Sequence, residues 1–431
     1  MERPKIQFDP RMFISAPYIE CPKCKKESFG VLSVGRNVYT RRCKECWHSE
    51  TFKLPELHKI IIYLDQFVIS EMMKAIHTKL GKTDKVDPFW LHLFEKLERL
   101  SHLQLIVCPD SHFHQQESLL YEYKAHRRMY EQLSHGTTFF DPGTIHRFQV
   151  QQRFQQWLGL KDDHGDITAR DVIHGDPDAW QEKFIISVDF EHGDEEISSI
   201  RRSRDAAHEG IAEVFARWRN EPKKKFIERF EEEGLAWGRV MIQKYITSLV
   251  KEGLGQATME DFVISTMSDE SILITGLSMY LPHEPEKTEE NLRKMSMFLQ
   301  SEDMLQVPFN RLSALMWAAI ADQAAHDATR KPPNKGVVND IDMISTLLPY
   351  CDAMFIDRDM YGLLQYGPLR IEAEKGYPAK IFSTSNKEAF MEYLDGLEKN
   401  ADPKLLATIR EVYGEPTAYT TMYERDGWED D

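Results

Sequence analysis

The feature that most constrains the fold is an unbroken apolar run, Ile60-Ile-Ile-Tyr-Leu64, which ends in Asp65. Its β-branched and aromatic residues, with no polar residue between them, predict a strand buried on both faces, as in parallel sheets. A helical pattern follows at once, from Phe67 to Ala75. Because open α/β sheets bind ligands beyond the carboxyl ends of their strands, Asp65 is either a helix cap or the first residue of a site.

The residues after this unit continue the alternation of helix and strand. Apolar residues recur at helical spacing from Trp90 to Leu100 and predict a packing helix. Leu103–Pro109 predicts a second buried strand, and the helix expected after it carries Glu117 in its first turns. The order strand, helix, helix, strand is typical of the start of a Rossmann-like α/β layer.

Elements of the same kind return near the other end of the chain. The predicted elements are a helix over 308–328, a helix from 339, a strand over 353–356, a strand over 379–383 and a helix over 390–397. Asp340 and Asp342 lie in the first turn of the second of these helices. Asp357 and Asp359 follow the first of these strands. Acidic residues therefore stand at the ends of predicted elements in both halves of the chain.

Four carboxylates share this setting: Asp65, Glu117, Asp340 and Asp357. Parallel α/β topology brings strand carboxyl ends and helix amino ends to one edge of a sheet. Like charges collected there repel each other unless a cation neutralises them, and hard oxygen ligands suit Mg²⁺ or Mn²⁺. A pair of such ions can activate water and stabilise both oxygens of a reacting phosphodiester.

The ordered set of motifs resembles the PIN-like nuclease fold. The motifs are Ile-Tyr-Leu-Asp-Gln at 62–66, Cys-Pro-Asp-Ser-His-Phe-His-Gln-Gln-Glu-Ser at 108–118, Asp-Ile-Asp-Met-Ile at 340–344 and Leu-Pro-Tyr-Cys-Asp-Ala-Met-Phe-Ile-Asp-Arg-Asp at 348–359. The resemblance covers about residues 57–125 and 305–400. It implies an α/β protein, with a PIN-like (Rossmann-like) parallel sheet domain that is split by a large helical insertion over 126–304.

The resemblance also implies an activity, the metal-dependent hydrolysis of RNA or, as second choice, DNA. Asp65, Glu117, Asp340 and Asp357 would then be the Mg²⁺ or Mn²⁺ ligands. Asp340 is preferred to Asp342 because the apolar residues that follow it form the buried stripe of its helix, and Asp357 is preferred to Asp359 because it directly follows the strand. Asp342 and Asp359 are the alternative candidates for these two ligand positions. Gln66 departs from the small polar residue that PIN domains usually place after the first Asp, and the insertion far exceeds ordinary loop length.

Four cysteines near the N-terminus, Cys21, Cys24, Cys43 and Cys46, form two Cys-x-x-Cys knuckles. This spacing is a strong signature of a tetrahedral Zn²⁺ site, and four thiolates leave no open position, so the expected zinc is structural. The intervening residues predict a β-hairpin that turns at 35–37, so residues 1–56 resemble a zinc ribbon. Disulfides are disfavoured because no secretory signal precedes the cysteines. Cys108 and Cys351 are expected to be buried thiols.

The ribbon is expected to act as a platform. Tyr39 and Trp47 are candidate stacking surfaces for nucleic acid. The basic residues around the cysteines are Lys23, Lys25, Lys26, Arg36, Arg41, Arg42 and Lys44. A folding staple and a protein docking site are the alternatives.

The predicted insertion over 126–304 is mainly helical and contains no repeat. It is expected to be either a lid over the acidic site or a surface for a protein partner or a homo-oligomer. Arg202 and His208 form an Arg-x5-His pair that resembles HEPN ribonucleases, which implies metal-independent RNA cleavage as an alternative. Residues 401–431 are expected to form a C-terminal tail.

Charge is unevenly distributed along the chain. The formal net charge is −16, whereas residues 1–60 hold 12 Lys and Arg against 7 Asp and Glu. A basic module could therefore hold a polyanion beside an acidic, metal-binding remainder. No apolar stretch is long enough to cross a bilayer and no signal peptide is evident, so a cytoplasmic protein without a membrane partner is expected. Analogy with PIN-like proteins suggests a toxin or a defence effector, and the non-enzyme alternative is a nucleic-acid- or protein-binding scaffold.

Overall fold

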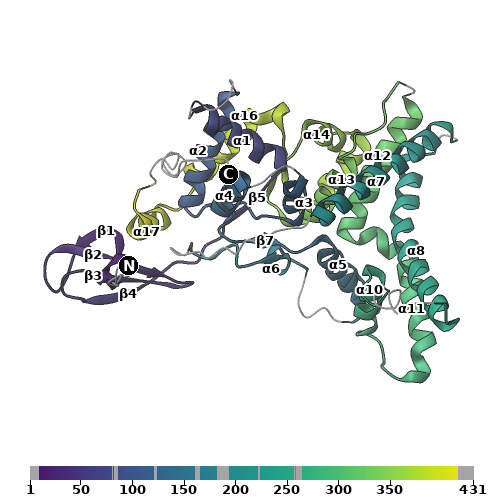
Figure 1. Cartoon of the computed structure of the whole chain (residues 1–431), viewed down its shortest axis with the longest axis horizontal. Helices are drawn as coiled ribbons and strands as arrows, with labels where there is room; N and C mark the ends of the chain where they lie inside the picture. The colour runs from purple at the N-terminus through teal and green to yellow at the C-terminus, as the bar shows by residue number, and fades with distance from the viewer. Residues whose placement is uncertain are drawn as a thin grey trace, which may run out of the picture.

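The computed structural model describes residues 9–79, 81, 86–120, 124–160, 166–181, 194–221, 224–256, 258, 265–327 and 329–415. An antiparallel sheet lies at one end of the molecule, a parallel sheet lies near the middle, and long helices lie at the other end (Figure 1). The prediction of a mixed α/β protein with a small N-terminal β module is confirmed. None of the described helices is both long and apolar enough to span a membrane.

The N-terminal module is a four-stranded antiparallel sheet whose strands lie side by side in chain order. Its strands are β1 (Ser15–Glu20), β2 (Glu27–Val34), β3 (Val38–Cys43) and β4 (Ser49–Lys53). The predicted hairpin joins β2 to β3, where the Gly35 N–H donates to the Val38 carbonyl at 2.9 Å. Because successive strand residues face opposite sides, Arg41 and Arg42 lie on different faces of this sheet.

The second sheet is parallel and has the strand order β10-β9-β5-β6. Its strands are β5 (Ile60–Leu64), β6 (Ile106–Val107), β9 (Ala353–Phe355) and β10 (Lys380–Phe382). From β5 the chain goes first to β6 on one side and later to β9 on the other, so β5 and β9 flank a topological switch point. Ligands of open α/β sheets bind at such a point. β6 is shorter than predicted because Gln104, with a φ of 53°, turns the chain just before it.

Helices cover both faces of this sheet, as the apolar strands β5, β6 and β9 require. Ile62, Leu64 and Phe355 are buried on one face together with side chains of four helices. These helices are α1 (Gln66–Lys79), α2 (Pro88–His102), α4 (Lys124–Ser134) and α16 (Lys387–Lys399). Tyr63 and Met354 are buried on the other face with α12 (Pro308–His326) and α13 (Val337–Leu347).

Shorter elements complete the region around the sheet. They are α3 (His112–Leu120), β7 (Thr138–Phe139), β8 (Ile173–His174), α6 (Ala169–Val172), α14 (Arg358–Leu364) and α15 (Gly367–Gly376). Elsewhere in the described chain, 3-10 turns lie at Pro10–Phe13, Pro285–Lys287, Glu302–Gln306, Leu348–Tyr350 and Thr384–Asn386. β7 pairs with β8 and meets Asp110, which follows β6, through one parallel bridge. α3 therefore begins close to the carboxyl end of β6.

The described part of the insertion is mainly helical, as predicted. Its long helices are α5 (Pro142–Trp157), α7 (Asp194–Asn220), α8 (Phe226–Gly253), α10 (Asp269–Ser278) and α11 (Thr288–Leu299). α8 approaches the end of α11 so closely that a Cβ at Gly238 would lie 1.9 Å from the Leu299 carbonyl oxygen. The predicted boundary at 125/126 falls inside α4, whose Met129 and Leu133 are buried in the sheet core. That helix belongs with the sheet because its apolar side chains complete the layer over α1 and α2.

The segment from residue 401, predicted as a tail, contains helix α17 (Pro403–Tyr413). Its Ile409 and Val412 are fully buried in a cluster with Val31 and Tyr39 of the N-terminal sheet. Arg41, of which 2% is exposed, donates to the carbonyl oxygens of Pro17 and Phe29 at 2.9 Å and to that of Glu411. The far end of the described chain is therefore packed against the N-terminal module.

Candidate metal sites

The four knuckle cysteines lie together at one end of the N-terminal sheet. The Sγ atoms of Cys21 and Cys46, and those of Cys24 and Cys43, are 3.6 Å apart. A tetrahedral ion with Zn–S bonds of about 2.3 Å requires sulfur–sulfur separations of about 3.8 Å. In the described part of the chain, this is the one group of three or more candidate ligands whose atoms all lie within 4.8 Å. The cluster therefore fits a structural zinc ion.

The two knuckles are built in the same way. The residue after the second cysteine of each knuckle has a left-handed backbone, with φ of 59° at Lys25 and 61° at Trp47. The N–H groups of these two residues donate back to the Cys21 carbonyl at 2.9 Å and the Cys43 carbonyl at 3.2 Å. Each knuckle therefore turns its two sulfur atoms toward one point. Cys108 and Cys351 are buried and remote from this cluster, as predicted.

A second candidate site lies at the carboxyl end of β5. A small pocket there is lined by Tyr63, Asp65, Gln66, Phe113, His114, Glu117, Asn339, Asp340 and Met343. Its free volume is ≈ 10 Å³, about what a single water molecule needs. The fold thus brings Asp65, Glu117 and Asp340 together from β5, α3 and α13, although 275 positions separate the first from the last.

Asp65 is a largely buried carboxylate of this pocket. Its backbone N–H donates to the Phe355 carbonyl at 3.0 Å, which fixes it beside β9. The pKa of Asp65 is raised to about 7, chiefly by burial and then by the negative charges of Glu117 and Asp357. The positive charge of His114 and the N–H of Gln66 lower this pKa by less. Ionised Asp65 is therefore costly in the absence of a cation.

Asp357 has two partners within its own turn. It caps α14, because its Oδ1 accepts the Asp359 N–H at 2.6 Å and the Met360 N–H at 3.0 Å. It does not line the pocket, but its charge reaches Asp65. Burial raises the pKa of Asp357 above its ordinary value. Asp359 is exposed beside it.

The structure separates Asp340 from Asp342. Asp340 lines the pocket, whereas Asp342 lies on another side of α13, because residues two apart on a helix face away from each other. Asp342 bonds to Thr346, its Oδ1 lies 3.9 Å from His146 Nε2, and burial raises its pKa to about 6. Asp342 thus belongs to a different cluster, in which His146 stacks on Phe309 at 3.8 Å.

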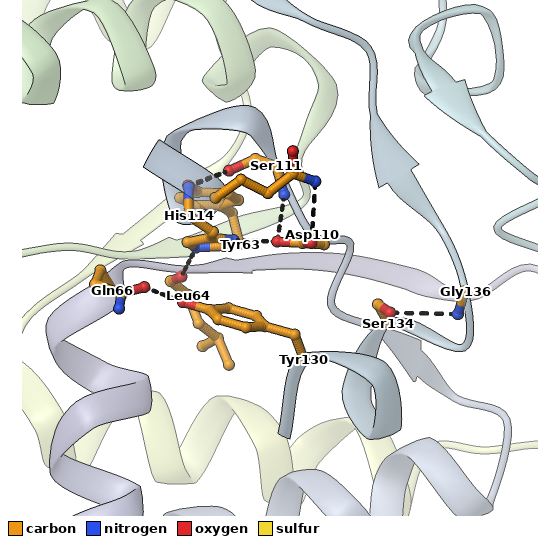
Figure 2. A network of polar contacts seen from close by, with 10 residues as sticks. Tyr63, Leu64, Gln66, Asp110, Ser111, His114, Tyr130, Ser134 and Gly136 are labelled. Atoms are coloured by element: carbon orange, nitrogen blue, oxygen red, sulfur yellow. Dashed lines mark hydrogen bonds and ion pairs between the residues drawn. The ribbon is translucent and has the colours of Figure 1, made fainter. Parts of the chain in front are cut away.

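A polar network that includes two lining residues of the pocket, Tyr63 and His114, involves side chains to which the sequence assigned no role. His114 donates from Nε2 to the Leu64 carbonyl at 2.8 Å, and its Nδ1 lies 3.1 Å from Asp110 Oδ1. The imidazole stacks against the Tyr63 ring at 4.7 Å, and the Tyr63 hydroxyl meets Ser111 Oγ at 2.9 Å (Figure 2). This network holds the last carbonyl of β5, the one directly before Asp65. The i, i+4 spacing of Asp110 and His114 was the available sequence signal.

The chemistry of the donor set suits a hard divalent cation. The pocket carboxylates do not form a group of three with all ligand atoms within 4.8 Å, among the residues that the structure describes. Mg²⁺ is commonly held through one or two carboxylates and not by a closed set of protein ligands, so the wider spacing of these carboxylates is compatible with such an ion. Asp65, Glu117 and Asp340 would hold the ion, directly or through its waters.

The residues of the alternative HEPN-like pair both lie on α7. Arg202 is exposed, whereas the side chain of His208 lies outside the described part of the chain. Six positions along a helix turn it by about 600°, which leaves the two positions about 120° apart around the axis.

Compared with protein-family models, with curated proteins and with solved structures, the chain has no match. The residues and their geometry are therefore the basis for any functional conclusion.

Proposed function

We propose that this protein is a metal-dependent nuclease with a PIN-like catalytic domain, acting on RNA in the first instance. The observation that carries the proposal is the gathering of Asp65, Glu117 and Asp340 in one pocket at the switch point of a parallel sheet. The raised pKa of Asp65 supports it, because crowded carboxylates persist at a site where a cation compensates them.

Each residue has a stated role in this proposal. Asp65, Glu117 and Asp340 hold the cation. Asp357 does not line the pocket, but its negative charge acts on Asp65. Bound Mg²⁺ or Mn²⁺ would activate water and stabilise charge on the phosphodiester oxygens. His114 is a positioning residue, since its hydrogen bond to the Leu64 carbonyl fixes the backbone that presents Asp65.

The test is cleavage of labelled single-stranded RNA and DNA with and without added Mn²⁺. We expect Mn²⁺-dependent cleavage by the native chain and its loss in Asp65→Asn. Asp342→Asn is the matched control, because it removes a carboxylate of the same helix as Asp340, α13, that does not line the pocket. Equal cleavage by Asp65→Asn, or cleavage that persists without divalent cations, would overturn the proposal. No Mn²⁺ binding at all would favour a non-catalytic scaffold.

A further inference from the structure

One face of the N-terminal sheet carries two exposed aromatic rings, each with a cation over it. The Arg42 guanidinium lies 4.7 Å from the centre of the Trp47 ring, and Lys44 Nζ lies 4.6 Å from that of Tyr18. The two aromatic residues are 40% and 38% exposed. We call these four residues, Tyr18, Arg42, Lys44 and Trp47, the outer face.

The strand register shows that these residues form one surface. Gly30 of β2 pairs directly with Arg42 of β3, and residues paired in this way share a face of the sheet. A Cβ at Gly30 would lie 2.6 Å from Tyr18 Cε1, so the Tyr18 ring covers Gly30 on the side of Arg42. Lys44 donates to the Tyr18 hydroxyl and so belongs to the same side.

The cations of the outer face differ from their neighbours in the same sheet. Lys26 pairs with Glu45 at 2.9 Å and Lys25 pairs with Glu20 at 3.5 Å. Arg42 and Lys44 form no ion pair with any described residue, and the buried Nε of Arg42 has no hydrogen-bond partner. The positive charges of Arg42 and Lys44 are therefore not neutralised by a described carboxylate, and anionic oxygens of a ligand could pair with them.

The opposite face of the sheet is already occupied. Tyr39 and Arg41 point to that side, where both side chains contact Glu411 of α17. Among the residues that the structure describes, α17 covers the opposite side, so the outer face is the side available to a large ligand. Of the two candidate stacking residues named from the sequence, Tyr39 is 4% exposed and Trp47 remains accessible.

We infer that the outer face binds single-stranded nucleic acid. Bases would stack on the exposed sides of the Trp47 and Tyr18 rings, while Arg42 and Lys44 neutralise the phosphates between them. A duplex buries its bases in its own stack and would offer these rings nothing. The inference deepens the proposed function, because it names a second contact for the nuclease substrate, but binding here needs neither the acidic pocket nor its cation.

The experiment measures fluorescence anisotropy of a labelled oligouridylate, using the full chain with Asp65→Asn and no added Mn²⁺. We expect Trp47→Asn and Tyr18→Ala each to raise the Kd roughly 5- to 100-fold, which is the range of base–aromatic stacking energies. Asn tolerates the left-handed backbone at position 47. Trp47→Phe and Tyr18→Phe keep a stacking ring and should restore most of the affinity. Unchanged zinc content in each variant shows that the module is folded.

The matched control is a cation–aromatic pair elsewhere on the protein. Lys380 Nζ lies 4.5 Å from the centre of the Tyr393 ring, and Tyr393→Ala should leave the Kd unchanged. Equal affinity for duplex and single strand, or no loss in the ring variants, would overturn the inference. Tighter binding of polyglutamate that depends on Arg42 and Lys44 but not on the rings would instead identify an acidic protein as the partner. Unchanged binding by the ring variants, together with Mn²⁺-dependent cleavage by the chain that retains Asp65, would overturn this inference and leave the proposed nuclease standing.

Discussion

The two candidate metal sites differ in how the chain assembles them. The cysteine site draws its ligands from residues 21–46, within adjacent strands and two short turns. The acidic site draws Asp65, Glu117 and Asp340 from three elements that a parallel sheet and its helices bring together. Sulfur atoms in the first site lie 3.6 Å apart, whereas no comparable group of three oxygens forms in the described part of the second.

The two sites therefore differ in how metal binding is related to folding. In the cysteine site, local turns alone aim the ligands, so zinc binding and folding of the small module are coupled. In the acidic site, the packing of distant elements brings carboxylates together, and the pKa of Asp65 near 7 reflects chiefly its burial and then the repulsion from Glu117 and Asp357. The first site is therefore expected to need its metal for structure, whereas in the second a metal would offset the cost of an ionised, largely buried Asp65.

The largest expected effect is on the cysteine site. Replacing Cys43 by Ser removes one of four thiolates, and structural zinc contributes about 10–16 kcal/mol of binding free energy in small modules. We expect bound zinc to fall from one equivalent to none and β1–β4 to lose protection from hydrogen exchange. Metal analysis and exchange mass spectrometry measure the two effects. Cys108→Ala should keep the zinc, and a Cys43→Ser protein that also keeps it would contradict the assignment.

The next effect separates activity from stability at Asp65. Asp65→Asn should lower Mn²⁺-dependent cleavage by roughly 10²-fold or more, because it removes a ligand of the proposed cation. A folded-state pKa raised above the unfolded value means that stability falls as pH rises from about 4 to about 7. At pH 8 without added divalent cation, Asp65→Asn should therefore raise the unfolding free energy, by about 1–4 kcal/mol. Thermal unfolding is the measurement, and a lower Tm in the variant would argue against a strained site.

Glu98 is a control for Asp65, because it is a buried carboxylate that belongs to neither metal site. Burial, with a smaller effect from Glu95, raises the pKa of Glu98 to about 8, and its carboxylate accepts from Gln132. The sign is the same as for Asp65, so native stability should fall as pH rises from about 4.5 to about 8, and Glu98→Gln should remove about 1–3 kcal/mol of that fall. Added Mn²⁺ should reduce the gain from Asp65→Asn and leave that from Glu98→Gln unchanged in thermal unfolding. An equal response to Mn²⁺ in both variants would mean that the pocket has no specific cation.

The smallest expected effects on the cleavage rate concern the alternative ligand candidates Asp342 and Asp359. Asp359 is exposed and Asp342 lies in a separate cluster, so Asp359→Asn and Asp342→Asn should each change the cleavage rate by less than about threefold. Asp340→Asn, at the pocket itself, should lower it at least about tenfold. Single-turnover cleavage ranks the three variants, and a larger loss in Asp342→Asn than in Asp340→Asn would reverse the placement of the site on α13.

The parts of the fold that the sequence predicts are those governed by short-range patterns. Ile60–Leu64 is a buried strand because every residue is apolar, and Cys21 to Cys46 form a cluster because knuckle geometry is local. The position of Asp340 in the pocket also follows from a local pattern, the buried stripe of its own helix.

What the sequence did not predict depends on packing between distant segments. The role of α17 as a cover for the ribbon arises from contacts between residues more than 350 positions apart. The stacking of His114 on Tyr63 requires β5 and α3 to meet, and no periodicity along either segment encodes that meeting. The pairing of Tyr18 with Lys44 likewise depends on a glycine in the neighbouring strand.

The buried guanidinium of Arg41 has a consequence for substrate length. By joining the N-terminal sheet to the last turn of α17, it helps to fix the outer face at a constant separation from the acidic pocket. A strand held at both places must bridge that separation, so short oligonucleotides gain from one contact and longer ones from two. The affinity for single-stranded oligonucleotides should therefore rise in a step at the length that reaches both places, as it does for a bivalent ligand.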